Sequence, residues 1–168
     1  MILSELARWK QSAHRKPLML RGARQVGKTT AVNLFAGNYP QYIQLNLDND
    51  ADAGLFRQIK NARQLAESIF FLKQKNWQQR HETLLFIDEI QQSPEAIGML
   101  RYFYEELPEL HVIAAGSLLE TVLNEKINIP VGRVEYRVMR PVSFYEFLLA
   151  LDETAAAEAL IQLPFKEF

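Results

Sequence analysis

Apolar residues along the chain fall into two patterns, both typical of β-strands. Three short runs are apolar throughout, at 18–20, 84–87 and 112–115, as expected of parallel strands that are covered on both faces of a sheet. Two other segments, 42–47 and 134–138, alternate apolar and polar residues, as expected of strands at a sheet edge with one face toward solvent. The pattern therefore predicts a sheet with three buried strands and two edge strands.

Segments with helical spacing separate these strands. They cover 2–13, 28–36, 51–59, 62–77, 94–107 and 118–126. Residues that begin or end helices support several of these boundaries. Gly37 is placed as a C-terminal cap and Asn61 as an N-cap. Ser93 is a further N-cap, because Pro94 after it suits the first position of a helix. Strands that alternate with helices predict an α/β sandwich with right-handed crossovers.

The end of the chain is typical of a junction between domains. Ser143 and Glu146 have the spacing of a capping box, which predicts that a helix begins there. A second helix is predicted over 154–163, and two phenylalanines follow it. We expect residues 1–140 to form the core domain and residues 141–168 to form a helical junction to a further C-terminal domain. The residues after about 150 should then be poorly packed, disordered or docked on another molecule.

Composition narrows the class of protein. The chain has 168 residues, enough for one domain with a substantial core. Its net charge of −1 gives no bulk attraction to nucleic acid or to a membrane surface, and no apolar run is long enough to span a bilayer. The absence of cysteine excludes disulfides and thiolate metal sites and favours the reducing cytoplasm. The histidines His14, His81 and His111 lack metal-ligand spacing.

The strongest chemical signal is GARQVGKT, which spans Gly22 to Thr29 and fits the phosphate-loop pattern G-x-x-x-x-G-K-[ST]. It follows an apolar strand and begins a helix, the context that this pattern requires. The glycines let successive backbone N–H groups point at phosphate oxygens, and the positive end of the helix dipole adds to the attraction. The lysine of the pattern reaches the β- and γ-phosphates, and the threonine hydroxyl coordinates Mg²⁺.

These properties assign nucleotide contacts to the whole loop and to the residue after it. The predicted nucleotide-binding residues are Gly22, Ala23, Arg24, Gln25, Val26, Gly27, Lys28, Thr29 and Thr30. Lys28 is also assigned to catalysis, because its charge can stabilise charge that develops on the γ-phosphate. The Arg24 side chain is expected to point outward or toward a partner. The alternative, a glycine-rich turn before an ordinary helix, leaves Lys28 and Thr29 unexplained.

A pair of carboxylates follows the buried strand at 84–87. A Mg²⁺–triphosphate needs an acidic group at the carboxyl edge of the sheet, and Asp88 suits that role. Glu89, next along the chain, is placed where a base could orient and polarise an attacking water. An apolar strand that ends in two acidic residues is common by itself. Its position sixty residues after Lys28, with a strand between, makes the metal and catalytic roles more specific.

Two further residues are candidates for catalysis. Ser117 follows the buried strand at 112–115, where its hydroxyl could bond the γ-phosphate or the attacking water. The alternative is a serine that caps the helix predicted after it. Arg133 precedes the last strand and could stabilise transition-state charge within the chain or in a neighbouring one. The alternative is a solvated surface arginine.

Taken together, these segments resemble the AAA-type P-loop ATPases of bacteria and archaea whose full-length members carry a C-terminal domain of unknown function. The matching segments are RKPLMLRGARQVGKTT at 15–30, YIQLNLD at 42–48, LLFIDEIQ at 84–91, AAGSLLE at 114–120, GRVEY at 132–136 and PVSFYEFL at 141–148. The resemblance implies ATP and Mg²⁺ as ligands, the roles given above, and a three-layer sandwich with a five-stranded parallel sheet of order 5-1-4-3-2. That order agrees with the alternation of 42–47 and 134–138, because it places both at edges. The resemblance also implies a C-terminal domain, often compared with nuclease-like folds.

The sequence thus predicts an ATP-binding, Mg²⁺-dependent ATPase domain that drives a conformational switch in a larger protein. Its expected partners are ATP and the C-terminal domain, and a homo-oligomer would let Arg133 act in trans. One alternative is a GTPase or small-molecule kinase, although Asn124-Glu125-Lys126 is not the guanine-selecting N-K-x-D and no arginine-rich lid is evident. Another is a module that binds nucleotide without hydrolysing it. The process that ATP would drive stays open between DNA, a protein partner and a toxin-like or defence role.

Overall fold

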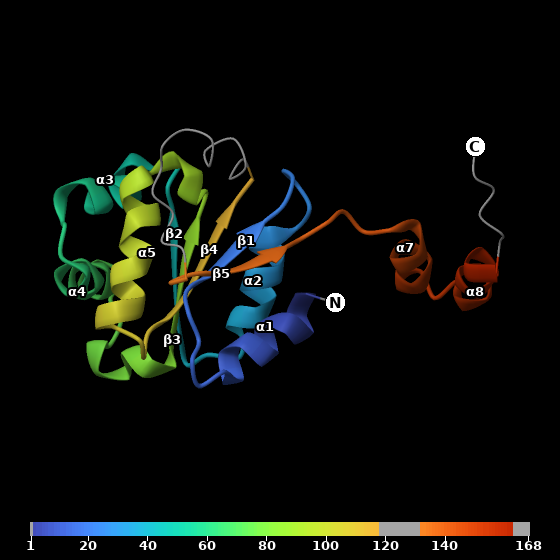
Figure 1. Ribbon diagram of the computed structural model, residues 1–168, viewed down its shortest axis with the longest axis horizontal. Helices are drawn as coiled ribbons and strands as arrows, with labels where there is room; N and C mark the ends of the chain where they lie inside the picture. The colour runs from blue at the N-terminus through green and yellow to red at the C-terminus, as the bar shows by residue number, and fades with distance from the viewer. Residues whose placement is uncertain (1, 118–131, 163–168) are drawn as a thin grey trace.

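Five parallel strands form one sheet in the computed structural model, which describes residues 2–117 and 132–162 (Figure 1). The strands are β1 (Leu18–Arg21), β2 (Gln41–Asn46), β3 (Thr83–Asp88), β4 (His111–Gly116) and β5 (Glu135–Val138). Their order across the sheet is β2-β3-β4-β1-β5, and each neighbouring pair is parallel. This confirms the predicted order 5-1-4-3-2, counted from the other edge.

The burial of each strand follows its place in the sheet. Every residue of β3 and β4 is buried, because these strands have a neighbour on each side and helices on both faces. In β2, at one edge, buried residues alternate with less buried ones. At the other edge, no residue of β5 is fully buried. The two alternating segments therefore lie at the edges, as their patterns predict.

Helices cover both faces of the sheet, so the core has three layers (Figure 1). One layer holds α1 (Ile2–Gln11) and α2 (Lys28–Ala36), and the other holds α3 (Asp50–Gln58), α4 (Ala62–Leu72) and α5 (Pro94–Glu106). Leu18 and Leu20 of β1 belong to the apolar core under α1 and α2, whereas Met19 belongs to the core under α3, α4 and α5. Successive residues of a pleated strand point to opposite faces, and β1 thereby joins both cores.

The predicted helix caps are confirmed. The Asn61 side chain accepts a hydrogen bond from the Gln64 N–H at 2.9 Å, and the Ser93 hydroxyl accepts one from the Ala96 N–H at 3.2 Å. α2 covers residues 28–36 as predicted and has Gly37 at its C-cap. These local signals set helix boundaries without help from distant parts of the chain.

α4 is shorter than the helix predicted over 62–77. It ends at Leu72, and Gln74 then takes a left-handed conformation with φ 53°. The Gln41 side chain accepts from the Asn76 N–H at 2.8 Å and donates to the Asn76 carbonyl at 2.9 Å. This two-way contact ties the connection to the start of β2. The prediction of a helix up to residue 77 is therefore wrong, because a tertiary contact ends the helix before its apolar spacing does.

Two 3₁₀ helices flank β3. They are η1 (Trp77–Glu82) and η2 (Ile90–Gln92). The Trp77 ring packs edge-on against Phe70 of α4, with 5.1 Å between ring centroids. η2 leads from β3 into α5 and holds residues that border the site described below.

The last two helices lie apart from the three layers (Figure 1). α7 (Phe144–Ala150) begins at the predicted capping box, in which the Ser143 hydroxyl accepts from the Glu146 N–H and the Glu146 carboxylate accepts from the Ser143 N–H. α7 and α8 (Thr154–Gln162) contact each other. The exposed apolar side chains of this segment are Val142, Phe144, Phe147, Leu149, Leu151 and Ile161. The division into a core and a junction stays a prediction.

Two predicted features, the helix over 118–126 and the chain end after residue 162, lie outside the described residues. Among the helices that the structure does describe, none has the length and apolar character needed to cross a membrane.

Candidate nucleotide-binding site

A cleft of about 510 Å³ opens where the parallel strands end, a size typical of small-molecule sites. Its lining residues follow β1, β2, β3 and β4, and they are Arg24, Gln25, Gly27, Lys28, Thr29, Thr30, Asp48, Glu89 and Ser117. A second hollow of about 510 Å³, between α3 and α4, is mainly apolar and holds none of the predicted site residues. The chemistry therefore places the candidate site in the first cleft.

The phosphate loop curls through two left-handed residues, Gln25 with φ 64° and Gly27 with φ 88°. Gly27 is the N-cap of α2 and has no side chain that could bond the first turn of the helix. The uncapped N–H groups at the start of α2 therefore lie beside the cleft that Gly27, Lys28 and Thr29 line. Such a helix start is suited to bind phosphate, because free N–H groups and the helix dipole both attract an anion.

Lys28 is 7% exposed, and its ammonium donates to the carbonyls of Gly22 at 2.9 Å and Ala23 at 2.8 Å. Burial lowers the pKa of Lys28, while the nearby Glu89 and Asp88 act in the opposite direction. The side chain is thus held inside its own loop by two carbonyl oxygens. A bound triphosphate would offer this ammonium charged oxygens in place of neutral ones.

A hydrogen bond of 2.8 Å joins the Thr29 hydroxyl to a carboxylate oxygen of Asp88. It connects the phosphate loop to the end of β3 and confirms that the two motifs meet. Burial raises the pKa of Asp88, and the hydrogen bonds from Thr29 and from the Glu89 N–H oppose that shift. Hydroxyl and carboxylate oxygens are the donors that Mg²⁺ prefers, so this pair fits the predicted metal site.

Glu89 lies at the turn that follows β3, with φ 53°. Its N–H donates to Asp88 at 3.0 Å, and its carboxylate accepts a hydrogen bond from the Gln91 side-chain amide. The turn separates the two adjacent carboxylates: Asp88 bonds Thr29, whereas Glu89 lines the cleft. Glu89 thus lies in the cleft beside the phosphate loop, and its role as a catalytic base stays a prediction.

Asp48 is a cleft residue that the sequence analysis did not select. It lies just after β2, and its carboxylate accepts from the Gln92 side-chain amide at 2.7 Å. Its position at the end of a strand is the signal that could have identified it, because the carboxyl ends of parallel strands share one edge of the sheet.

Ser117 also lines the cleft, at the end of β4. Its hydroxyl oxygen is buried and has no hydrogen-bond partner within the part of the chain that the structure covers. A buried polar group without a partner is costly unless a ligand or water satisfies it. Its alternative role as a helix cap concerns residues 118–126, which are not described.

The two arginines considered in the sequence, Arg24 and Arg133, lie at different ends of the sheet. Arg24, expected to point outward, lines the cleft. Arg133 lies just before β5, and its guanidinium bonds Glu105 at 2.9 Å at the end of α5. Because β5 runs parallel to β1, with Glu135 beside Leu18, Arg133 is at the amino end of the sheet, opposite the cleft. Arg133 is therefore not brought to the other predicted site residues.

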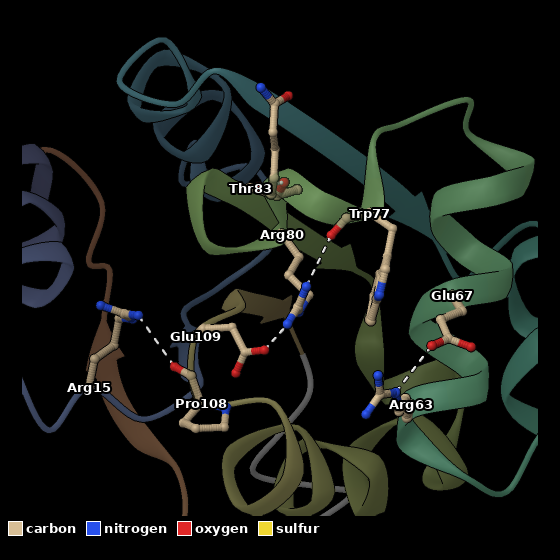
Figure 2. Close-up of polar contacts among 9 residues, drawn as sticks. Arg15, Arg63, Glu67, Trp77, Arg80, Thr83, Pro108 and Glu109 are labelled. Atoms are coloured by element: carbon tan, nitrogen blue, oxygen red, sulfur yellow. Dashed lines mark hydrogen bonds and ion pairs between the residues drawn. The ribbon is translucent and has the colours of Figure 1, made fainter.

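Figure 2 shows polar contacts at this amino end of the sheet. Arg15 donates to the Pro108 carbonyl at 3.4 Å, and Arg80 forms an ion pair of 2.7 Å with Glu109. These contacts tie together the segments that lead into β1, β3 and β4. They stabilise the connections between elements at the amino ends of the strands, whereas the candidate nucleotide-binding cleft lies at the carboxyl ends.

Comparison with known families gives one match that covers most of the chain. A family model described as an AAA domain matches residues 14–148. No curated protein matches the chain significantly. The family match and the cleft both support nucleotide binding.

Many solved structures share the fold, among them the three that follow. The Walker-type ATPase PABY2304 of Pyrococcus abyssi has 21% identity and a TM-score of 0.57, over 95% of this chain and 59% of that one. The Orc1 protein of Aeropyrum pernix, in complex with DNA, has 16% identity and a TM-score of 0.55, over 94% and 47%. PCH-2 of C. elegans has 14% identity and a TM-score of 0.51, over 99% and 48%. The chain thus spans about half to three fifths of each structure.

Proposed function

The chain belongs to the AAA domain family, and on that premise we propose that it binds ATP and hydrolyses it to ADP and phosphate. The observation that carries the proposal is the 2.8 Å hydrogen bond between Thr29 and Asp88. This bond assembles the phosphate loop, the acidic end of β3 and the neighbouring Glu89 around one cleft. A glycine-rich turn without nucleotide chemistry would have no need of that assembly.

The loop and α2 would hold the phosphates. The N–H groups at the start of α2 bond phosphate oxygens, and Lys28 moves its ammonium from the Gly22 and Ala23 carbonyls to the β- and γ-phosphates. Thr29 and Asp88 would hold Mg²⁺, which when bound neutralises phosphate charge. These residues bind the substrate and stabilise charge, and they take no part in covalent chemistry.

Glu89 and Ser117 would act on the reacting groups. Glu89 orients a water for attack on the γ-phosphorus and accepts its proton, since its carboxylate lines the cleft beside the phosphate loop. The unpartnered Ser117 hydroxyl bonds the γ-phosphate or the water. As the bond between the γ-phosphorus and the β–γ bridging oxygen breaks, the charge moves onto ADP, next to Lys28.

We also propose that hydrolysis drives a conformational change in a larger protein. α7 and α8 stand outside the three layers, and several of their large apolar side chains are exposed, as expected of a segment that packs on another domain. The Met139 N–H, just after β5, donates to the carbonyl of Arg21, the last residue of β1 before the phosphate loop, at 2.7 Å. Movement of the loop could therefore reach this segment directly.

Phosphate release from ATP and from GTP, with and without Mg²⁺, tests the proposal. We expect Mg²⁺-dependent release from ATP, lost in Lys28→Ala together with binding of a fluorescent ATP analogue. The exposed Lys60 lies away from the cleft, so Lys60→Ala serves as the matched control. Release from GTP alone would indicate a GTPase, and binding without release would indicate a non-catalytic module. Unchanged nucleotide affinity in Lys28→Ala would refute the phosphate-loop assignment.

A further inference from the structure

We propose that Arg24 of the phosphate loop is a catalytic arginine that acts within its own chain, on the terminal phosphate of ATP. It would contact the γ-phosphate and stabilise the charge that builds up during hydrolysis. The inference rests on the proposed ATPase function and adds to it a residue for which the sequence suggested a different orientation.

The first observation is the position of Arg24. Its side chain is exposed and lines the same cleft as Lys28, Glu89 and Ser117, the residues that would surround the γ-phosphate. The next residue, Gln25, is left-handed with φ 64°, so the loop turns sharply directly after Arg24. The loop backbone would contact the phosphates, and Arg24 lines the cleft that would hold the outermost one.

The second observation is that Arg24 has no partner among the residues that the structure describes. Within the described ranges, no hydrogen bond, ion pair or ring contact joins it to another residue. Six other arginines of the described chain form ion pairs with carboxylates, namely Arg57, Arg63, Arg80, Arg101, Arg133 and Arg137, and none of these six lines the cleft. Two carboxylates share the cleft with Arg24, yet Asp48 bonds Gln92 and Glu89 bonds Gln91. The guanidinium is therefore free to bind a ligand.

The third observation is the charge of the site. Two carboxylates, Asp48 and Glu89, line the cleft, and Lys28 is the other cationic side chain among its described lining residues. With Asp88 assigned to Mg²⁺, these two carboxylates would still oppose the negative charge that builds up on the γ-phosphate. A guanidinium matches this need, because it keeps its charge and presents paired donors to phosphate oxygens.

The position of Arg133 strengthens the assignment. Arg133 is held by Glu105 at the opposite end of the sheet, so it cannot supply positive charge to the cleft of its own chain. Arg24 occupies the site without any rearrangement of strands or helices. Within one chain, the structure assigns the catalytic arginine to position 24.

The test compares Arg24→Ala, Arg24→Lys and a matched control, Arg63→Ala, in the full chain. Arg63 is exposed on α4, in an ion pair of 3.1 Å with Glu67, and lies outside the cleft. Three quantities are measured: affinity for a fluorescent ATP analogue, kcat for phosphate release, and capture of ADP with aluminium fluoride, which mimics the transferring phosphoryl group. A merely structural role would not affect the capture selectively.

We expect Arg24→Ala to lower kcat by about 10- to 1000-fold, with ATP-analogue affinity changed by less than about fivefold and ADP–fluoride capture lost. Arg24→Lys should recover part of kcat, and Arg63→Ala should match the wild type. Wild-type kcat or capture in Arg24→Ala would overturn the assignment, as would a loss of kcat no larger than the loss of affinity.

Two controls separate this inference from neighbouring ones. If wild-type chain binds ATP but releases no phosphate, the proposed function fails, and the role of Arg24 in hydrolysis fails with it. If the wild type hydrolyses ATP and Arg24→Ala does so equally, the role of Arg24 alone fails. Mixing Arg24→Ala with Glu89→Gln should give no activity beyond the sum of the two, and a rescue would overturn the same-chain assignment.

Discussion

Glu89 has a left-handed backbone, with φ 53°, at the point where the chain leaves β3. Residues with a Cβ adopt this conformation at a cost of about 1 kcal/mol or more, and functional sites are enriched in them. Here the turn directs two consecutive carboxylates toward different partners. Asp88 meets Thr29 at 2.8 Å, and Glu89 reaches the cleft with its carboxylate positioned by Gln91.

The first prediction concerns Glu89, the proposed catalytic base. Glu89→Gln should leave ATP binding intact and lower turnover about 100-fold or more, because the amide keeps the shape of the side chain but cannot accept a proton. Steady-state phosphate release and titration with a fluorescent ATP analogue measure the two effects. Glu67→Gln, on the exposed surface of α4, is the control. Hydrolysis at the wild-type rate in Glu89→Gln would mean that Glu89 is structural.

His111 is the buried titratable residue with the clearest consequence for stability. Its Nδ1 lies 2.7 Å from the Tyr39 hydroxyl, and its ring contacts Trp9 edge-on. Burial lowers the pKa of His111 to about 3, and the positive charges of Arg15 and Lys10 add to the shift. In the unfolded chain an imidazole has a pKa of about 6.5, so below that pH the unfolded state binds a proton that the native state excludes.

The second prediction follows from the lowered pKa of His111 in the native state. The free energy of unfolding should fall as pH drops from about 6.5 toward 3, and His111→Gln should remove part of the dependence while it keeps an acceptor for Tyr39. Between pH 6.5 and 5 we expect the wild type to lose about 1 kcal/mol more than the variant, after allowance for solvent screening. Urea unfolding at both pH values measures the difference. Equal losses would show that His111 is protonated in the native state.

At the scale of elements, β5 and the phosphate loop depend on each other. The Met139 N–H bonds the Arg21 carbonyl at 2.7 Å, and Arg21 stacks on the Tyr136 ring at 4.0 Å. Gly22, with φ 155°, lies so close that an added Cβ would overlap the Met139 carbonyl oxygen. The first glycine of the motif therefore serves a packing role as well as a role in the loop.

The third prediction tests that role. Gly22→Ala should lower the free energy of unfolding by about 1–3 kcal/mol, since both the backbone conformation and the Met139 contact oppose a side chain. Gly98→Ala is the matched control, because an added Cβ there meets nothing within 4 Å and the position is inside α5. The control should gain about 0.5–1 kcal/mol. A neutral Gly22→Ala in urea unfolding would contradict the close contact.

At the scale of the whole molecule, the three-layer core is separate from α7 and α8. The hydrogen bonds of α7 and of the turn after it join residues within 143–157. Arg133 is at the amino end of the core, away from the cleft. The next two predictions test the division of the chain and the role of Arg133.

The fourth prediction is that a chain of residues 1–140 folds with the thermal midpoint of the full chain. The removed helices contact each other and stand away from the sheet, so their loss should leave both cores intact. A chain cut at residue 132 is the control, because it also loses β5, which pairs with all of β1. Thermal unfolding by circular dichroism compares the three. A lower midpoint for residues 1–140 would refute the proposed division of the chain.

The fifth prediction concerns Arg133. In a single chain, Arg133→Ala should leave turnover within about twofold of the wild type, and it should leave the thermal midpoint nearly unchanged, because the ion pair with Glu105 is exposed to solvent. A trans role would appear as reduced turnover at concentrations where the chain assembles. Mixing Arg133→Ala with Glu89→Gln would then restore activity, and such a rescue would contradict the prediction.

Local chemistry determined much of this protein. The alternation of 42–47 and 134–138 and the apolar runs between them identified edge and central strands, because burial follows directly from position in a parallel sheet. The caps at Asn61, Ser93 and Ser143 were readable because each bonds a residue three positions away. The phosphate loop was readable for the same reason, since its function depends on consecutive residues.

Only the tertiary structure decided which of the candidate residues meet. It joined Thr29 to Asp88, brought Asp48 and Arg24 into the cleft and left Arg133 at the opposite end of the sheet. A motif records the neighbours of a residue along the chain, whereas these outcomes depend on strand direction and on which end of each strand a loop follows. In a parallel sheet all the loops after the strands share one edge, and Arg133 precedes its strand.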